Sequence, residues 1–91
     1  MTSWGRFAAA EPRLAEFVAD RLVAAPSYLA TVRADGAPRV HPVTPVVTDE
    51  GLFVFMEPGS PKGHDVRERG WFALHSSVPD NAGTGGEASV T

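Results

Sequence analysis

Hydrophobic residues recur every three or four positions in the first part of the chain. In the segment EPRLAEFVADRLVAA this stripe consists of the apolar residues Leu14, Phe17, Val18 and Leu22 together with one charged residue, Arg21. The spacing predicts a helix that packs one face against a sheet. Pro12 suits the first turn of that helix, and Pro26 ends it.

From Tyr28 onward the period changes to two, which predicts strands. YLATVR and PRVHPVTPVV flank the turn segment ADGA around Gly36 and form an antiparallel pair. Alternation predicts that one face of the second strand carries Arg39, His41, Val43 and Pro45, and that the other carries Val40, Pro42, Thr44 and Val46. Prolines on both faces remove backbone donors, so we expect an edge or bulged strand that is not paired along its whole length.

The second half of the chain predicts three further strands and one short helix. LFVFM is almost wholly apolar, as expected of a strand buried on both faces or at a subunit contact. Ser60 suits an N-cap, Pro61 a first helical position and Gly70 a C-terminal stop, which places a helix over Pro61 to Arg69. WFALHSS predicts a fourth strand, VPDNAGTGG predicts a long loop, and EASVT predicts the start of a fifth strand. The fifth strand would leave an unpaired edge, which indicates a missing C-terminal part or a second subunit.

Composition narrows the class of protein. The 91 residues are enough for one domain, residues 1–91. The net charge of −3 gives no general attraction to nucleic acid or to an anionic membrane. The chain has no cysteine, no signal-like start and no long apolar run, so we expect a cytoplasmic protein held together by its core or by a second subunit.

The segment GSPKGHD carries the most specific candidate chemistry. Ser60 and Lys62 stand at a predicted helix start, where free amides and the helix dipole favour a phosphate or carboxylate. Arg39 and His41 add two anion ligands on one face of a neighbouring strand. The alternative is a capped, solvated helix start with a surface arginine and histidine.

Other groups of residues give weaker evidence of a functional site. The histidines His41, His64 and His75 lie in separate elements without metal-site spacing, so no metal is predicted. Ser76 lacks the glycine-flanked elbow of a hydrolase nucleophile, and GTGG lacks the spacing of a nucleotide-binding loop.

Two segments, LATVRADGAPRVHPV and GLFVFMEPGSPKGHDVRERGWFALHS, together resemble the flavin-binding split-barrel family that includes pyridoxamine 5'-phosphate oxidase. The similarity runs in order from about Tyr28 to Ser76, so the chain looks like the first two thirds of a family domain. The resemblance implies a mainly β fold with some α, an antiparallel split β-barrel with an N-terminal helix and one short helix between strands. It also implies a homodimer with flavin mononucleotide (FMN) in a groove at the interface.

The resemblance also implies a set of cofactor-binding residues. The second strand would line the flavin ring, the end of the third strand would border it, and the helix start would hold its phosphate. These positions are Arg39, His41, Pro42, Val43, Thr44, Phe55, Met56, Ser60 and Lys62. The proline-interrupted strand would leave backbone groups for a planar ring.

Three departures from the oxidase bear on function. His41 and Pro61 stand where the oxidase has arginines, and Val46 stands where it has a substrate-contacting lysine. We therefore expect a flavin-dependent oxidoreductase acting on another small molecule or on reduced nicotinamide, with no assignable catalytic residue. The alternatives are a non-enzymatic module that binds flavin, deazaflavin or haem, and a dimeric scaffold without cofactor.

Overall fold

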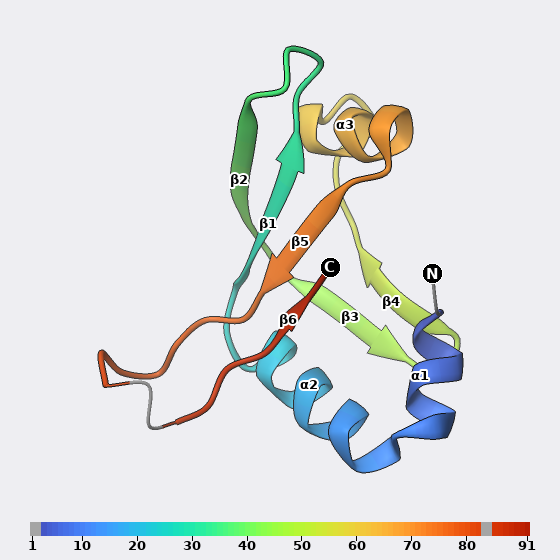
Figure 1. The fold of residues 1–91 in the computed structure, drawn as a ribbon, viewed down its shortest axis with the longest axis vertical. Helices are drawn as coiled ribbons and strands as arrows, with labels where there is room; N and C mark the ends of the chain where they lie inside the picture. Colours follow the sequence, from blue (N-terminus) through green and yellow to red (C-terminus); the bar gives the residue numbers. More distant parts are fainter. Residues whose placement is uncertain (1–2, 83–84) are drawn as a thin grey trace.

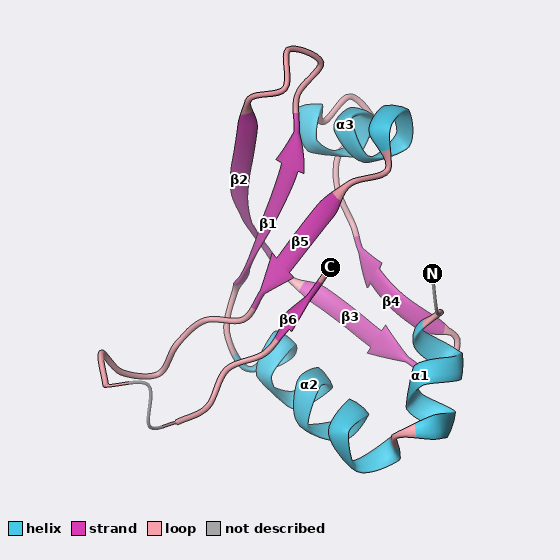
Figure 2. Cartoon of the chain, viewed as in Figure 1, coloured by secondary structure: helices cyan, strands magenta, loops and turns pink. Residues whose placement is uncertain are grey.

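A computed structural model describes residues 3–82 and 85–91 as a mixed α/β protein with antiparallel sheets (Figures 1 and 2). In chain order the elements are α1 (Trp4–Ala10), α2 (Pro12–Ala24), β1 (Ser27–Val32), β2 (Pro38–Val43), β3 (Pro45–Thr48), β4 (Gly51–Val54), α3 (Pro61–Arg69), β5 (Phe72–His75) and β6 (Ser89–Val90). The two predicted helices are confirmed as α2 and α3, and the five predicted strands correspond to β1 to β6 because the second of them is divided in two. Helix α1 was not predicted; Ser3 caps it by accepting a hydrogen bond from the Arg6 amide at 3.3 Å.

The strands form two antiparallel sheets. One has the order β2-β1-β5-β6, and the other is the hairpin β3-β4. The predicted turn joins β1 to β2, with Gly36 at φ 86° and the Arg33 amide bonded to the Ala37 carbonyl at 2.9 Å. A positive φ of this kind favours glycine.

The segment PRVHPVTPVV is divided between the two sheets. Its first half is the edge strand β2, which pairs with β1 as far as Val43, and its second half is β3, which pairs with β4. Thr44 separates the two. The expectation of a strand not regularly paired along its whole length is therefore confirmed, and Pro45 takes the first position of a strand, where a missing amide is tolerated.

The core joins α2 to the larger sheet. Its buried members are Leu22, Leu29, Val43 and Leu74. The predicted stripe on α2 is only partly right, because Leu14 and Phe17 are exposed and the inward face is carried by Ala15 and Leu22. The periodicity of the sequence shows which residues share one face of the helix. Which of those residues are buried depends on the elements that pack against that face.

Two expectations are met only in part. No barrel is closed among the described residues, because β4 and β6 are both edge strands without a common ladder. Of the two alternatives for LFVFM, burial on both faces within one chain is wrong: Phe53 and Phe55 are 43% and 79% exposed, whereas Leu52, Val54 and Met56 are partly buried beside the core. The other alternative, a subunit contact, stays a prediction. In the described part of the chain, no helix has the length and apolar character needed to cross a membrane.

The core predicts a contrast between two leucines of α2. Leu22 is 0% exposed and Leu14 is 51% exposed. We expect Leu22→Ala to lower the free energy of unfolding by about 2–5 kcal/mol, since it removes buried methyl groups and leaves a cavity. Urea denaturation measures the change. Leu14→Ala is the matched control and should cost less than about 1 kcal/mol; equal losses in both variants would contradict this packing.

Candidate functional site

The start of α3 presents the polar groups that the sequence singled out. Pro61 occupies the first helical position, and Ser60 is the N-cap, with its carbonyl accepting a hydrogen bond from the His64 amide at 3.1 Å. At the other end Gly70 closes the helix with φ 77° and donates its amide to the Val66 carbonyl at 2.8 Å. The predicted bounds of this helix are therefore confirmed.

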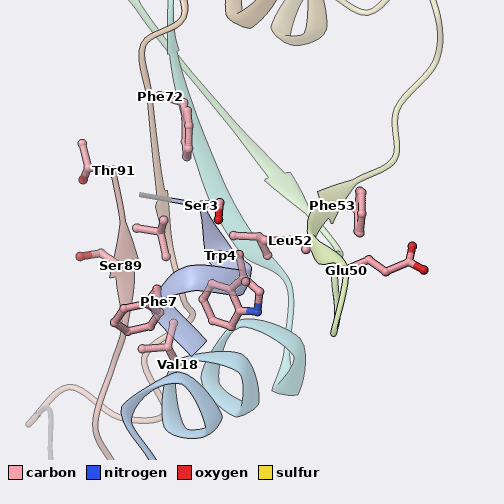
Figure 3. A pocket seen from close by; sticks show the side chains of 13 residues that line it. Ser3, Trp4, Phe7, Val18, Glu50, Leu52, Phe53, Phe72, Ser89 and Thr91 are labelled. Carbon is pink, nitrogen blue, oxygen red and sulfur yellow. The ribbon is translucent and has the colours of Figure 1, made fainter. Parts of the chain in front are cut away.

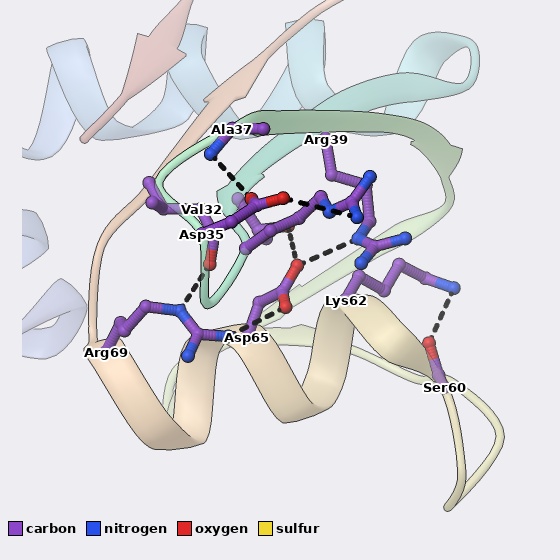
Figure 4. Close-up of polar contacts among 10 residues, drawn as sticks. Val32, Asp35, Ala37, Arg39, Ser60, Lys62, Asp65 and Arg69 are labelled. Carbon is purple, nitrogen blue, oxygen red and sulfur yellow. Dashed lines mark hydrogen bonds and ion pairs between the residues drawn. The ribbon is translucent and has the colours of Figure 1, made fainter.

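Ser60 and Lys62 meet at this helix start. The Ser60 side chain makes no capping bond and instead accepts a hydrogen bond from Lys62 Nζ at 3.0 Å (Figure 4). The first-turn amides of Lys62 and Gly63 have no carbonyl of their own helix to bond. An ammonium, a hydroxyl and two amides thus gather where the helix dipole is positive, which suits an oxyanion.

Asp65 ties this helix to the β1-β2 hairpin. Its Oδ2 accepts from Thr31 Oγ1 at 2.8 Å and from Arg39 Nε at 2.9 Å, and its Oδ1 accepts from an amino group of Arg69 at 2.9 Å (Figure 4). Arg69 Nε also donates to the Val32 carbonyl. One buried carboxylate therefore holds both arginines and fixes the angle at which α3 lies on the sheet.

The partners of Asp65 decide its protonation. Burial would by itself raise the pKa of this carboxyl, but hydrogen bonds from Thr31, Arg39 and Arg69 outweigh that effect and lower the pKa from its ordinary 3.8 to about 2. The carboxylate is consequently ionised throughout the neutral and mildly acidic range.

The cluster retains an excess of positive charge. Arg39, Arg69 and Lys62 supply three cations against the single carboxylate of Asp65. Within the described part of the chain, Arg39 uses only its Nε in hydrogen bonds. Its two terminal amino groups therefore remain for an anionic ligand, since a guanidinium carries five donors.

The other predicted cofactor-binding residues are placed unevenly. Met56 packs against the first turn of α3, where a Cβ at Gly63 would lie 2.7 Å from its sulfur. His41 lies half-buried on the same face of β2 as Arg39. The remaining four do not gather at the helix start as a group: Val43 belongs to the core, and Pro42, Thr44 and Phe55 are exposed.

An apolar groove opens where the two sheets part. It has a volume of about 680 Å³ and lies between α1, β4 and the β5-β6 edge, with Trp4, Leu52 and Phe72 in its walls (Figure 3). A second cavity of about 290 Å³ shares Leu52 and Phe72 and reaches Met56 and Gly63 at the start of α3. Apolar surface therefore extends from α1 to Gly63 in the first turn of α3.

Sequence reasoning missed Asp65, Arg69 and Thr31. The four-residue spacing of Asp65 and Arg69 on a short helix was a readable signal for an ion pair. The bonds from Thr31 and Arg39 were not readable, since they join residues 34 and 26 positions apart.

A scan against protein-family models gives no match, and searches of curated proteins and of solved structures give none either. The similarity to flavin-binding split barrels therefore rests on the residues quoted above. Within residues 3–82 and 85–91, no group of three or more histidine, aspartate or glutamate side chains is placed to hold a metal ion.

The Asp65 cluster predicts an acid-dependent loss of stability. Because the folded chain lowers the pKa of Asp65, the stabilisation is complete above the ordinary value of 3.8 and disappears as the pH falls to about 2. We expect Asp65→Asn to lower the melting temperature at pH 7. Between about pH 4 and pH 2, the melting temperature of this variant should change less than that of the wild type.

The matched control is Asp35→Asn. Asp35 is exposed and pairs loosely with Arg33 at 3.5 Å, and its Oδ1 accepts a hydrogen bond from the Ala37 amide at 3.0 Å, which the asparagine oxygen can also accept. Thermal unfolding of this variant should resemble that of the wild type at pH 7. If Asp35→Asn lowered the melting temperature as much as Asp65→Asn, the buried hydrogen bonds of Asp65 would contribute no more to stability than the contacts of an exposed aspartate.

Proposed function

We propose that the chain binds FMN through its phosphate at the start of α3 and belongs to a dimeric split-barrel flavoprotein that transfers electrons to or from a small molecule. The observation that carries the proposal is the excess of positive charge around Ser60 and Lys62, where a hydroxyl, an ammonium and first-turn amides converge. The resemblance of the segment from about Tyr28 to Ser76 supplies the identity of the ligand.

The residues present fit the tail of FMN. A phosphate monoester needs several donors and positive charge, and Lys62, Ser60 and the amino groups of Arg39 offer both. Next to them, Met56 and the apolar wall of the 290 Å³ cavity provide a surface for a flat ring.

The protein's own part in such chemistry is binding and orientation. Bound flavin supplies the redox chemistry, a hydride or electron exchange with a substrate or reduced nicotinamide. Lys62 and Ser60 would fix the tail, and Asp65 would hold α3 so that these groups face the sheet. A deazaflavin could use the same helix start if it carries an anionic tail.

A cofactor carrier without turnover is the second candidate. It is favoured by the state of Asp65, the buried carboxylate of α3, which is already committed to two arginines and is therefore not available as a general acid or base. Steady oxidation of reduced nicotinamide by the FMN-loaded protein would indicate an enzyme, whereas FMN binding without such oxidation would favour the carrier.

Loss of the lysine ammonium should weaken cofactor binding. We expect Lys62→Ala to lose roughly 1.5 to 3 kcal/mol of FMN binding, or about 10- to 150-fold in Kd, because a charge-assisted hydrogen bond to phosphate disappears. Quenching of flavin fluorescence on titration with protein measures the Kd.

Arg67→Ala is the matched control. Arg67 lies on the same helix and is exposed, so this variant changes the net charge equally without touching the helix start. Its Kd should stay within about twofold of the wild type. Equal weakening in both variants would indicate a general charge effect, and no weakening in Lys62→Ala would place the lysine outside the site.

The proposed dimer accounts for the exposed face of the β3-β4 hairpin. Val46 and Phe53 are cross-strand partners on this face, and Phe55 continues the row. An exposed apolar row of this kind is typical of a subunit contact. We expect the wild type to be a dimer by light scattering and Phe53→Asp to be a monomer.

Val40→Asp is the control for this change. Val40 is an exposed valine of β2 and lies outside the row. Its dimer should persist. A wild type that is monomeric, or a Phe53→Asp variant that remains a dimer, would contradict the proposed contact.

A further inference from the structure

Met56 packs its sulfur atom against the first turn of α3. A Cβ added at Gly63 would lie 2.7 Å from Met56 Sδ and 3.6 Å from its Cγ, closer than real Cβ atoms come to a neighbour. The thioether therefore fills the space that a side chain at Gly63 would need. Gly63 directly follows Lys62, so this contact supports the turn that presents the Ser60–Lys62 pair.

The environment of this sulfur is both apolar and reachable. Met56 is partly buried and borders the 290 Å³ cavity, which is open to solvent and whose other walls include Val54, Val66 and Leu74. All side chains that line this cavity are apolar. A small oxidant can enter, but a polar group created there finds no side-chain partner in the lining.

We propose that Met56 is an oxidation site at which hydrogen peroxide loosens the start of α3. In this reaction one oxygen atom passes from peroxide to the thioether: the O–O bond breaks, an S–O bond forms, the sulfur is oxidised to a sulfoxide and the peroxide is reduced to water. The sulfoxide is larger and polar. Its oxygen is better solvated by water than by the apolar lining, so the sulfoxide should draw Met56 towards solvent and away from Gly63.

Few residues of this chain can be oxidised at sulfur. The chain has no cysteine and only two methionines, Met56 and the initial Met1. Peroxide chemistry at sulfur is thus confined to these two residues. The consequence for cofactor affinity rests on the proposed FMN site, whereas the consequence for the helix does not.

The test treats the full chain with hydrogen peroxide and compares three readouts before and after. Peptide mass spectrometry should place one added oxygen on Met56. Hydrogen exchange over residues 61–69 should become faster, and the melting temperature should fall. The Kd for FMN should rise by at least about fivefold, because the turn that carries Lys62 loses its packing contact with Met56.

Two variants isolate the sulfur. Met56→Leu keeps the apolar volume but has no sulfur to oxidise. Its hydrogen-exchange rate over residues 61–69, its melting temperature and its Kd for FMN should therefore be the same before and after peroxide treatment. Gly63→Ala displaces the flexible end of Met56 without creating a polar group, so exchange over the first turn of α3 should stay close to that of the untreated wild type.

The possible failures are distinguishable. If Met56 stays unoxidised in the folded chain while Met1 reacts, or if its sulfoxide leaves exchange and melting unchanged, the inference is overturned. If exchange and melting respond but the FMN affinity of a binding-competent wild type does not, the link to the cofactor site is overturned. A wild type that never binds FMN refutes the proposed function, and the exchange and melting readouts still decide the role of Met56.

Discussion

The buried carboxylate of Asp65 is the constraint on which the arrangement of the candidate site depends. It is the one fully buried residue that α3 contributes within the described chain, so the helix has no deeply buried apolar side chain to anchor it. A buried charge of this kind is tolerated only when it is paired and hydrogen-bonded. Thr31, Arg39 and Arg69 satisfy it from both the sheet and the helix. The orientation of α3, and with it the direction of Lys62, follows from those bonds.

Local signals made the helix α3 and the β1-β2 hairpin predictable. Ser60, Pro61 and Gly70 each act within a few residues of where they stand, and the same holds for Gly36 in the hairpin turn. The pairing of Ser60 with Lys62 was accessible for the same reason. The role of Arg39 was not, because its partner lies 26 residues away and both residues also suit a solvated surface. Sequence reasoning therefore identified a basic helix start but not the carboxylate that orients it.

The misjudged parts of the fold are those where tertiary contacts choose between equivalent local patterns. Leu14 and Leu22 fit the same helical stripe, yet only Leu22 faces the core. The apolar run Leu52 to Met56 fits a strand buried on both faces, but the single chain covers only one of them. The family resemblance implied a split barrel, and the described residues form two antiparallel sheets that fit its open arrangement without closing a barrel. In each case the local pattern defines an apolar surface without defining what covers it.

The β3-β4 hairpin connects these uncovered surfaces to the site. Its outer face bears Val46 and Phe53, while its inner face continues through Val54 to Met56, which rests on Gly63 of α3. In the proposed dimer, burial of the outer face would reduce the freedom of β4 and therefore of Met56. Ordering Met56 would in turn order the first turn of α3, where the phosphate is proposed to bind. A ligand that binds an already ordered turn loses less conformational entropy. Subunit association and cofactor binding should therefore favour one another, even though no residue of the outer face needs to touch the phosphate.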